Sequence, residues 1–225
     1  VIAESLRAIR TNIQYLASEK KSKVISVTSS IGGEGKTFTA MNLAAIFALA
    51  NYKTILIGAD LRKPKLHKDF NIDQSQGLSS LLINKSNISN VTKSSEIDNL
   101  FVIGSGPTPP NPSELLDSEM MNKIIDDLKK KYDYIIFDTP PIGLVTDGVI
   151  IMKHTDINLY VVRHAFTKYK SLDTINKIYN QNQVNNVQII INDFKQKSSS
   201  YGYGYGHGYG YEDSYGYGYY ENDNN

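Results

Sequence analysis

Cysteine and tryptophan are both absent from this chain of 225 residues. The missing cysteine excludes disulfide cross-links and thiolate metal sites, and it fits a reducing compartment. Long hydrophobic runs are absent too: the most apolar stretch, residues 41–50, is interrupted by Asn42 and is far shorter than the ~20 residues of a membrane-spanning helix. No signal peptide is recognisable, and a start at Val1 rather than at methionine is what we expect of a piece excised from a longer protein.

Basic residues are missing from the last part of the chain. Residues 201–225 contain no lysine or arginine and carry a charge of −4, which leaves +5 for residues 1–200 within the formal net charge of +1. A body this weakly basic does not favour binding to nucleic acid. We therefore expect no nucleic acid among the partners.

Hydrophobic periodicity divides residues 1–197 into alternating helices and strands. Apolar side chains at steps of three and four are typical of an amphipathic helix, β-branched runs indicate buried strands, and the prolines of residues 104–112 predict an irregular loop. We predict strands at 24–28, 54–57, 100–103, 134–137, 157–162 and 187–191, and helices at 2–16, 36–50, 113–131, 145–153 and 168–180. This alternation predicts one α/β domain whose mainly parallel sheet is covered by helices on both faces.

Residues 198–225 form a low-complexity tail. From Tyr201 onward it holds nine of the sixteen tyrosines of the chain, separated mostly by glycine. The tail has too little aliphatic surface to offset the chain entropy that folding would remove, so we predict that it is disordered. A role in a folded core therefore does not explain why tyrosines are concentrated in this segment.

A glycine-rich segment, SSIGGEGKT at Ser29–Thr37, lies between a predicted strand and a predicted helix. Glycines let successive backbone N–H groups turn toward phosphate oxygens, and the start of a helix adds partial positive charge. Lys36 is predicted to bind the β- and γ-phosphates and the Thr37 hydroxyl to bind Mg²⁺. The pattern G-x-x-x-x-G-K-[ST] departs at its first glycine, which is Ser30 here. The predicted nucleotide-binding residues of this segment are Gly32, Gly33, Glu34, Gly35, Lys36, Thr37 and Phe38.

Two further strands lead into aspartates. The segment YIIFDTPP places Asp138 at the carboxyl end of a strand, where side chains of a parallel sheet face the phosphate crevice. The segment ILIGADLRKP places Asp60 after another strand, followed by Arg62 and Lys63. We predict that Asp138 and Asp60 lie beside the same magnesium ion as Thr37.

These three stretches together resemble the Walker A, A′ and Walker B motifs of the bacterial tyrosine kinases that govern capsule and exopolysaccharide synthesis. The order of the motifs is the same, and the resemblance extends over essentially the whole chain. GPTPPNPSELL, at Gly106–Leu116, resembles the loop that precedes the Walker B region in that family, and the terminal tyrosine cluster is another family hallmark. The resemblance implies a MinD/ParA-like P-loop NTPase fold, with ATP and Mg²⁺ as cofactors.

The family resemblance also implies an assembly. ESLRAIR matches the E-x-x-R-x-x-R motif that joins subunits of the family into a ring, so residues 1–20 are expected to be an oligomerisation helix with contacts through Glu4, Arg7 and Arg10. A homo-oligomeric ring is implied, and the family suggests an octamer. The family phosphorylates its tail in trans, which implies the acceptors Tyr201, Tyr203, Tyr205, Tyr209, Tyr211, Tyr215, Tyr217, Tyr219 and Tyr220.

Other implied partners are a membrane-spanning polysaccharide co-polymerase or activator segment, fused or separate, and a counteracting tyrosine phosphatase. The implied location is the cytoplasmic face of the bacterial inner membrane. Asn192, which follows the last predicted strand, lies where relatives recognise the nucleotide base, although an asparagine that ends a strand has a structural explanation as well.

The chain departs from the family pattern in the A′ motif. Family members carry D-x-D there, and the first aspartate is replaced by Gly58. A tyrosine hydroxyl ionises near pH ~10, so it benefits from a carboxylate that accepts its proton. We expect Lys36 and Asp60 to be the catalytic residues, and Gly58 leaves open that Asp60 serves alone, that activity is low, or that the chain is a non-catalytic relative.

Two other functions are compatible with parts of the sequence. A MinD/ParA-type ATPase switch would share the fold, but its signature lysine, in the pattern K-G-G-x-G-K-[ST], is Ile31 here. It also leaves the tyrosine cluster unexplained. A nucleotide-binding pseudokinase scaffold would explain Gly58, with the tail binding partners through aromatic stacking.

Overall fold

The computed structural model describes residues 2–16 and 18–194. The predictions made for the tail, its disorder and its nine acceptor tyrosines, lie outside these residues. Within the described part, no helix is both long enough and apolar enough to cross a lipid bilayer.

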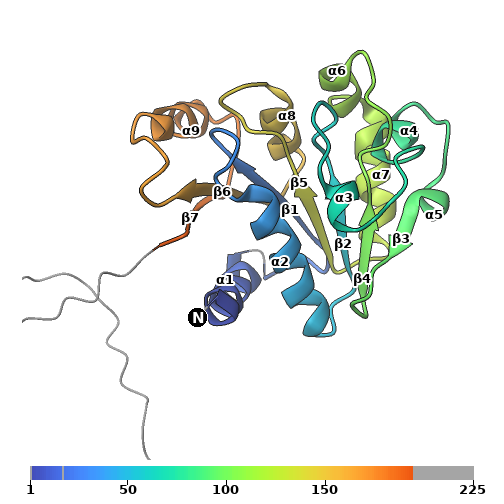
Figure 1. The fold of residues 1–225 in the computed structure, drawn as a ribbon, viewed down its shortest axis with the longest axis horizontal. Helices are drawn as coiled ribbons and strands as arrows, with labels where there is room; N and C mark the ends of the chain where they lie inside the picture. The colour runs from blue at the N-terminus through green and yellow to red at the C-terminus, as the bar shows by residue number, and fades with distance from the viewer. Residues whose placement is uncertain (1, 17, 195–225) are drawn as a thin grey trace, which may run out of the picture. The chain divides into compact units, whose positions relative to one another are not determined.

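A twisted seven-stranded sheet forms the centre of the described residues (Figure 1). Its order is β3-β4-β2-β5-β1-β6-β7, and each neighbouring pair is parallel except β3 with β4. The prediction of a mainly parallel α/β sheet is confirmed. The strands are β1 (Lys23–Ser29), β2 (Thr54–Gly58), β3 (Thr92–Ser94), β4 (Leu100–Ile103), β5 (Tyr134–Asp138), β6 (Ile157–Arg163) and β7 (Val187–Asn192).

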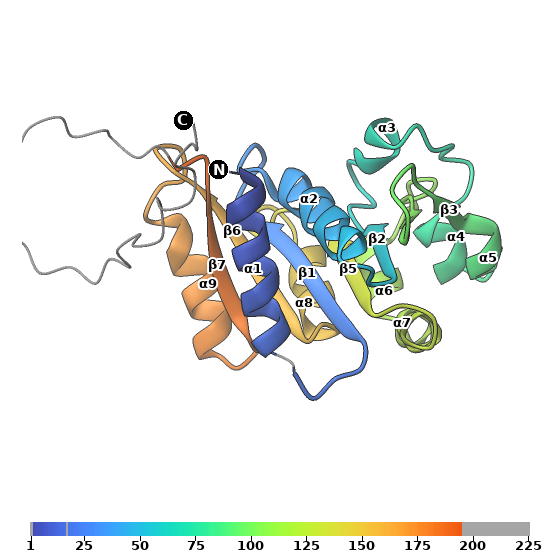
Figure 2. The same cartoon turned by 90° about the horizontal axis from the view of Figure 1, so that it is seen from below.

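Helices cover both faces of this sheet (Figure 2). α1 and α2 pack on one face, and α7, α8 and α9 pack on the other. The helices are α1 (Ile2–Leu16), α2 (Lys36–Leu49), α3 (Leu66–Asp69), α4 (Leu78–Leu82), α5 (Ile88–Val91), α6 (Pro112–Leu116), α7 (Glu119–Lys129), α8 (Asp147–Lys153) and α9 (Ser171–Asn180).

The core is divided between the two faces by the alternation of side chains along each strand. In β2, Ile55 and Ile57 pack with the α7 side, whereas Leu56 packs with α2 on the opposite face. All three side chains are completely buried, and each such burial contributes about 1.5–3 kcal/mol. Strands buried on both faces read as continuous apolar runs, which is why these strands were predictable.

One predicted helix, at residues 113–131, is wrong in its extent. It begins at Pro112 and is divided into α6 and α7, because Ser118 has extended backbone angles and its hydroxyl donates to the carbonyl of Leu115. The short elements α3, α4, α5 and β3 were not predicted. Segments of three to five residues carry too little periodicity to be recognised.

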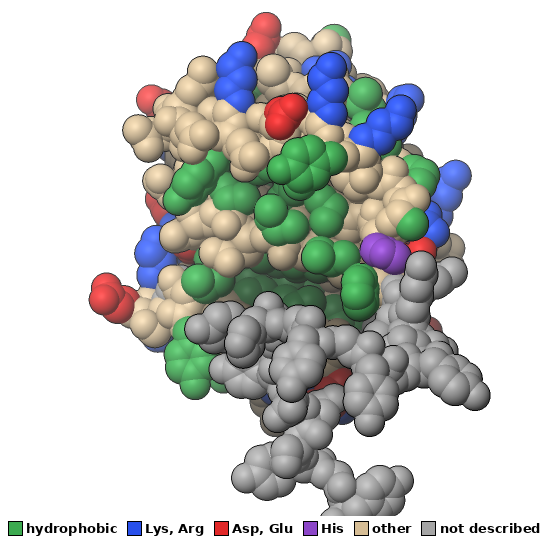
Figure 3. Space-filling view, turned by 90° about the vertical axis from the view of Figure 1, so that its left-hand side faces the viewer, with side chains coloured by type: hydrophobic (Ala, Val, Ile, Leu, Met, Phe, Trp, Pro, Cys, Tyr) green, Lys and Arg blue, Asp and Glu red, His purple; other side chains and the backbone are tan. Residues whose placement is uncertain are grey.

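The side of the molecule that bears β7 and α9 presents hydrophobic side chains to solvent (Figure 3). β7 is an edge strand of the sheet, and its Ile189 and Ile191 are more than half exposed. β7 is also the last secondary-structure element of the described chain.

The sheet brings the predicted motifs together. β1 and β5 are parallel neighbours, with Val27 opposite Asp138, and β2 lies on the other side of β5, with Gly58 opposite Asp138. The carboxyl ends of β1, β2 and β5 therefore open at the same edge of the sheet, which is the usual place for a ligand in this architecture.

Candidate functional site

The glycine-rich loop between β1 and α2 has the backbone that its composition predicts. Gly33 and Gly35 adopt positive φ angles of 89° and 97°, a conformation that residues other than glycine rarely adopt. A side chain at Gly35 would also have to displace Asn192, since its Cβ would lie 2.0 Å from Nδ2 of that residue. The loop ends at Lys36, the first residue of α2, so its amides precede a helix N-terminus.

Lys36, Thr37 and Asp138 form one cluster at this loop. Nζ of Lys36 donates to Oδ1 of Asp138 at 3.1 Å, and Oγ1 of Thr37 donates to Oδ2 at 2.8 Å. The sequence predicted these residues for one site, and the structure brings them into direct contact. Both carboxylate oxygens of Asp138 face the loop that was predicted to bind phosphate.

Asp138 is almost completely buried. Burial raises the pKa of Asp138, and the charge of Lys36 and the hydrogen bonds from Thr37 and Lys36 reduce this rise without cancelling it. The charge of Asp60 raises the same pKa further, so these two carboxylates are close enough to interact. A buried carboxylate next to a hydroxyl and a second carboxylate is a suitable environment for a hard divalent cation.

Asp60 lies just beyond β2 and is half-buried. Its Oδ1 accepts a hydrogen bond from the backbone N–H of Lys63 at 2.9 Å, which orients the side chain. Gly58 is the last residue of β2, and there is little room for a side chain at this position. A Cβ would lie 2.9 Å from Oγ of Ser105, and this hydroxyl donates a hydrogen bond to the Gly58 carbonyl. Ser105 therefore occupies space next to the position where the family carries its first A′ aspartate.

A second polar cluster beside the A′ segment was not predicted from the sequence. The guanidinium of Arg62 binds Asp147 through Nε at 2.7 Å and Nη2 at 3.1 Å, and Oγ of Ser113 donates to the same carboxylate at 2.6 Å. Asp147 is completely buried; burial favours a raised pKa, but the hydrogen bonds from Arg62 and Ser113 outweigh it and hold the pKa below its usual value. No local pattern marks this cluster, because its members come from three distant segments.

Glu34 and Asn192 brace the loop from within the protein. The carboxylate of Glu34 is completely buried, and it accepts hydrogen bonds from Ser30, Ile31 and Thr167. Nδ2 of Asn192 donates to the Glu34 carbonyl at 3.0 Å, so its amide rests on the loop backbone. The remaining two predicted nucleotide-binding residues are Gly32 and Phe38, and neither is enclosed by the protein. Gly32 has open space where a side chain would be, and Phe38 is exposed on the first turn of α2.

The predicted oligomerisation residues lie on α1, away from this cluster. Nη1 of Arg7 donates to Glu4 at 2.8 Å, and both side chains are more than half exposed. The opposite face of α1 is anchored in the core through Leu6 and Ile13. Arg10 is half-buried, and its Nε finds no hydrogen-bond partner within the described residues.

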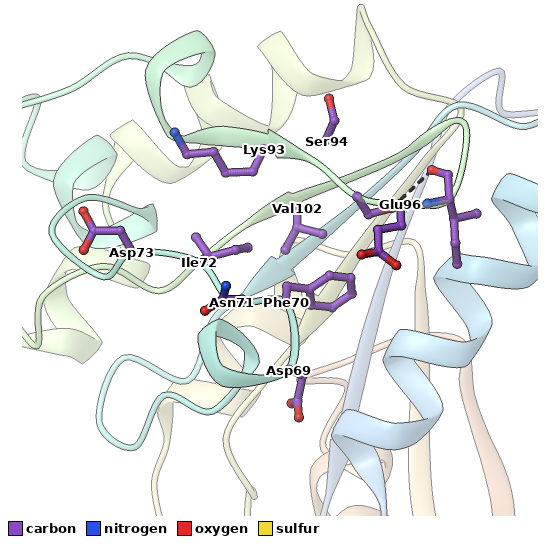
Figure 4. A pocket seen from close by; sticks show the side chains of 11 residues that line it. Asp69, Phe70, Asn71, Ile72, Asp73, Lys93, Ser94, Glu96 and Val102 are labelled. Carbon is purple, nitrogen blue, oxygen red and sulfur yellow. Dashed lines mark hydrogen bonds between the residues drawn. The ribbon is translucent and has the colours of Figure 1, made fainter.

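A separate cavity of about 500 Å³ lies at the far edge of the sheet. Figure 4 shows Phe70 and Ile72 beside Val102, with the carboxylates of Asp69 and Glu96 at the margins. None of its lining residues belongs to the glycine-rich loop or to the ends of β1, β2 and β5. The cavity is therefore distinct from the candidate site.

The candidate site fits a magnesium–nucleotide complex by the chemistry of its donors. Lys36 and the loop amides are suited to phosphate oxygens, and Thr37, Asp138 and Asp60 provide the hard oxygen ligands that Mg²⁺ prefers. The described residues contain no cluster of three or more histidine, cysteine or acidic side chains that could form a closed metal cage. Magnesium typically needs only one or two protein carboxylates when phosphates and water complete its shell.

Comparison with known proteins identifies the family. The AAA domain family model (AAA_31) matches residues 22–196. Tyrosine-protein kinase YwqD of Bacillus subtilis is 41% identical over 166 residues, which cover 74% of this chain and 70% of that protein. The chain belongs to the bacterial tyrosine-protein kinases.

Solved structures of this kinase family agree with the described fold. The kinase domain of the Escherichia coli tyrosine kinase ETK matches with a TM-score of 0.82 and 32% identity, covering 91% of this chain and 81% of that domain. The Pyrococcus furiosus cell division ATPase MinD matches with a TM-score of 0.61 at 22% identity, covering 74% of this chain and 69% of that one, and this likeness shows a shared fold alone. The predicted MinD/ParA-like P-loop fold is confirmed.

The relatives of this kinase family differ in length. Tyrosine-protein kinase ptk of Acinetobacter johnsonii is 38% identical over 199 residues, which are 88% of this chain but 27% of ptk. The chain thus spans about a quarter of the length of that relative.

Proposed function

We propose that this chain is an ATP-dependent protein-tyrosine kinase that phosphorylates the tyrosine-rich tail of a neighbouring copy. The observation that carries the proposal is the contact of Lys36 and Thr37 with Asp138 at the edge where β1 and β5 end. Family membership supports tyrosine as the acceptor, and the tail supplies nine tyrosines on a segment rich in glycine.

The chain's own residues divide the work at this site. Lys36 and the amides of the glycine-rich loop would bind and orient the β- and γ-phosphates, and Thr37, Asp138 and Asp60 would supply the oxygen ligands for Mg²⁺. When bound, the magnesium ion neutralises charge on the phosphate oxygens. Positioning and charge neutralisation supply most of the catalysis of phosphoryl transfer, so an intact cluster matters more than any one proton acceptor.

Asp60 is the proposed acceptor of the phenolic proton. A phenol with a pKa of about 10 is almost entirely protonated at neutral pH, so its oxygen becomes an effective nucleophile as the proton leaves. Asp60 is the carboxylate of the A′ segment that remains when the first position is Gly58. Its hydrogen bond from Lys63 N–H leaves Oδ2 as the oxygen for this role.

The length of the tail supports delivery in trans. Any segment of 25 residues can extend to at most ~80 Å, a length compatible with transfer to a neighbouring copy. We propose a ring-like homo-oligomer in which Glu4, Arg7 and Arg10 of α1 contact the next subunit. The exposed ends of Glu4 and Arg7 support this role.

The proposed cellular role is the control of capsule or exopolysaccharide synthesis and export. The kinase would act at the cytoplasmic face of the bacterial inner membrane, next to a membrane-spanning co-polymerase segment, and a tyrosine phosphatase would reverse its action. That segment would be either fused to the kinase or carried by a separate chain.

The proposal is tested by mixing two variants of the 225-residue chain with Mg²⁺ and ATP. One is Lys36→Ala with an intact tail, and the other has an intact site with all nine tail tyrosines changed to phenylalanine. Intact-mass spectrometry is expected to find phosphate on the Lys36→Ala chain, which can receive it only in trans. Each variant incubated alone is the control and should gain no mass on its tail.

The alternatives give different results in the same assay with the wild-type chain. Released phosphate without any gain in protein mass would instead support an ATPase switch of the MinD/ParA type. Neither phosphate release nor mass gain would support a nucleotide-binding scaffold, which Gly58 keeps open. Either result would refute the kinase proposal.

A further inference from the structure

Glu34 is an acidic residue at the centre of a loop whose proposed ligand is strongly anionic. We propose that its buried carboxylate is a positioning group that holds the glycine-rich loop in its phosphate-binding shape. The proposal rests on the proposed nucleotide-binding role of this loop, and it assigns to Glu34 a role that the loop pattern itself does not require. The residue acts through the loop backbone rather than by touching the reacting atoms.

The carboxylate of Glu34 accepts hydrogen bonds from three neutral donors. Oε1 accepts from Oγ of Ser30 at 2.7 Å and from Oγ1 of Thr167 at 2.5 Å, and Oε2 accepts from the backbone N–H of Ile31 at 2.9 Å. Three donors compensate for the loss of water around a buried charge. Because the side chain is completely buried, its charge is held inside the protein and is not presented on the loop surface.

These contacts account for the departure of the loop from the usual pattern. Ser30 stands at the position of the first glycine, and its hydroxyl is one of the donors to Glu34. A glycine there would remove this donor and leave the buried carboxylate with less compensation. Ser30 and Glu34 therefore form a pair across the loop, and the serine is explained by the glutamate.

The ends of β6 and β7 hold the loop from the other side. Oγ1 of Thr167 donates to Glu34 and accepts from the backbone N–H of Arg163 at 2.8 Å, so it links the loop to the end of β6. Nη1 of Arg163 donates to the Gly33 carbonyl at 3.3 Å, and Asn192 at the end of β7 donates to the Glu34 carbonyl. Arg163 and Asn192 thus reach the loop from the sheet, and Glu34 is the loop's own side chain that completes the connection through Thr167.

The expected effect is on nucleotide affinity. Glycines allow many backbone shapes, and ordering one residue on binding costs about 1–2 kcal/mol, or roughly tenfold in affinity. A loop that is already held by Glu34 avoids this cost at the moment of binding. Loss of the brace should therefore weaken nucleotide binding and loosen the loop before any nucleotide is present.

The test uses the full chain with Glu34→Gln, Thr167→Val and the double variant. In Glu34→Gln, one carboxylate oxygen is replaced by an NH₂ group, which faces either the Ile31 N–H or the two hydroxyls of Ser30 and Thr167. In Thr167→Val, the side chain keeps its shape but loses the hydroxyl that donates to Glu34. We expect each single variant to weaken Mg²⁺–ADP binding about tenfold in calorimetry and to speed amide exchange in residues 30–37 without nucleotide. The double variant should lose little more than either single one, because both changes break the same contact.

Glu96→Gln is the matched control. Glu96 is an exposed carboxylate between β3 and β4, at the far edge of the sheet, and its change should alter neither measurement. Unchanged ADP affinity and unchanged loop exchange in Glu34→Gln would overturn the proposal, and so would a lower melting temperature with unchanged affinity. If Glu34→Gln fails to fold, Thr167→Val decides by the same criteria.

The outcome is distinguishable from failure of the kinase proposal. ADP affinity and amide exchange do not require transfer of phosphate to tyrosine, so a chain that never phosphorylates its tail still reports on Glu34. A wild-type chain that binds ADP and shows no phosphorylation would refute the kinase function and leave this inference standing.

Discussion

Nζ of Lys36 lies 3.1 Å from Oδ1 of Asp138, although the two residues are 102 positions apart in the chain. The contact joins the first residue of α2 to the last residue of β5, across neighbouring strands β1 and β5. The lysine side chain is 12% exposed and the aspartate 4%, so the pair is largely shielded from solvent. We therefore expect a substitution in this pair to change the phosphorylation activity and the free energy of unfolding to different extents.

Replacing Asp138 with asparagine should abolish phosphorylation while leaving the fold stable. We expect tail phosphorylation to fall at least about 100-fold, since metal-assisted charge stabilisation is worth several kcal/mol. Burial already raises the pKa of Asp138, so a neutral side chain should change the free energy of unfolding by less than about 1 kcal/mol. Quantitative mass spectrometry and urea unfolding measure the two effects, and a loss of about 3 kcal/mol would show that the ion pair is structural.

Restoring the family aspartate at Gly58 should destabilise this chain. The new Cβ would meet Oγ of Ser105 at 2.9 Å, and the carboxylate would lie on the strand position directly opposite Asp138. Gly58→Asp is expected to cost about 1–3 kcal/mol of unfolding free energy through overpacking and charge repulsion.

The companion change Ser105→Ala distinguishes crowding from repulsion at Gly58. It removes the clashing hydroxyl, so it should recover part of the loss in Gly58→Asp, whereas alone it costs about 1 kcal/mol through its lost hydrogen bond to the Gly58 carbonyl. Urea unfolding of the four chains completes a double-mutant cycle. Strict additivity would contradict the packing argument.

Replacing Asp147 with asparagine should cost about 2–4 kcal/mol at neutral pH, because the bidentate contact with Arg62 is broken at a buried position. The folded-state pKa of Asp147 is lowered, so its contribution is fully present above the unfolded pKa of about 3.9 and is lost as the pH falls through the folded value. The difference between wild type and variant should therefore shrink below pH ~4. Thermal unfolding at several pH values measures it, and a constant difference would contradict the ionic account.

Changing Glu4 and Arg7 together to alanine should reduce the size of the oligomer without unfolding the chain. Their ion pair is exposed and i,i+3, so it contributes no more than about 0.5 kcal/mol to stability. The matched control is Asp127→Ala with Lys130→Ala, which removes a similarly exposed i,i+3 pair at the C-terminal end of α7. Light scattering should show smaller particles for the α1 variant alone, and equal sizes for both variants would count against α1 as the contact.

Much of the fold follows from local patterns. β4 and α1 have the bounds that the sequence predicts, because continuous apolar runs and a clean helical stripe leave few alternatives. The break at Ser118 was missed because the apolar spacing continues across it, and what marks the interruption is the extended backbone of Ser118 and its side-chain contact with the Leu115 carbonyl. Local propensity cannot anticipate such a break.

The sequence by itself determined the identity of the phosphate-binding loop, since glycines, Lys36 and Thr37 are adjacent and their spacing is a property of the backbone. Only the tertiary structure decided what surrounds that loop: the distant partner of the Glu34 carboxylate, Thr167, lies 133 residues away, and the carboxylate bound by Arg62, that of Asp147, lies 85 residues away. Such pairs depend on which strands are neighbours and on how side chains pack at their ends. Both are outcomes of the whole sheet, and no short stretch of the chain contains them.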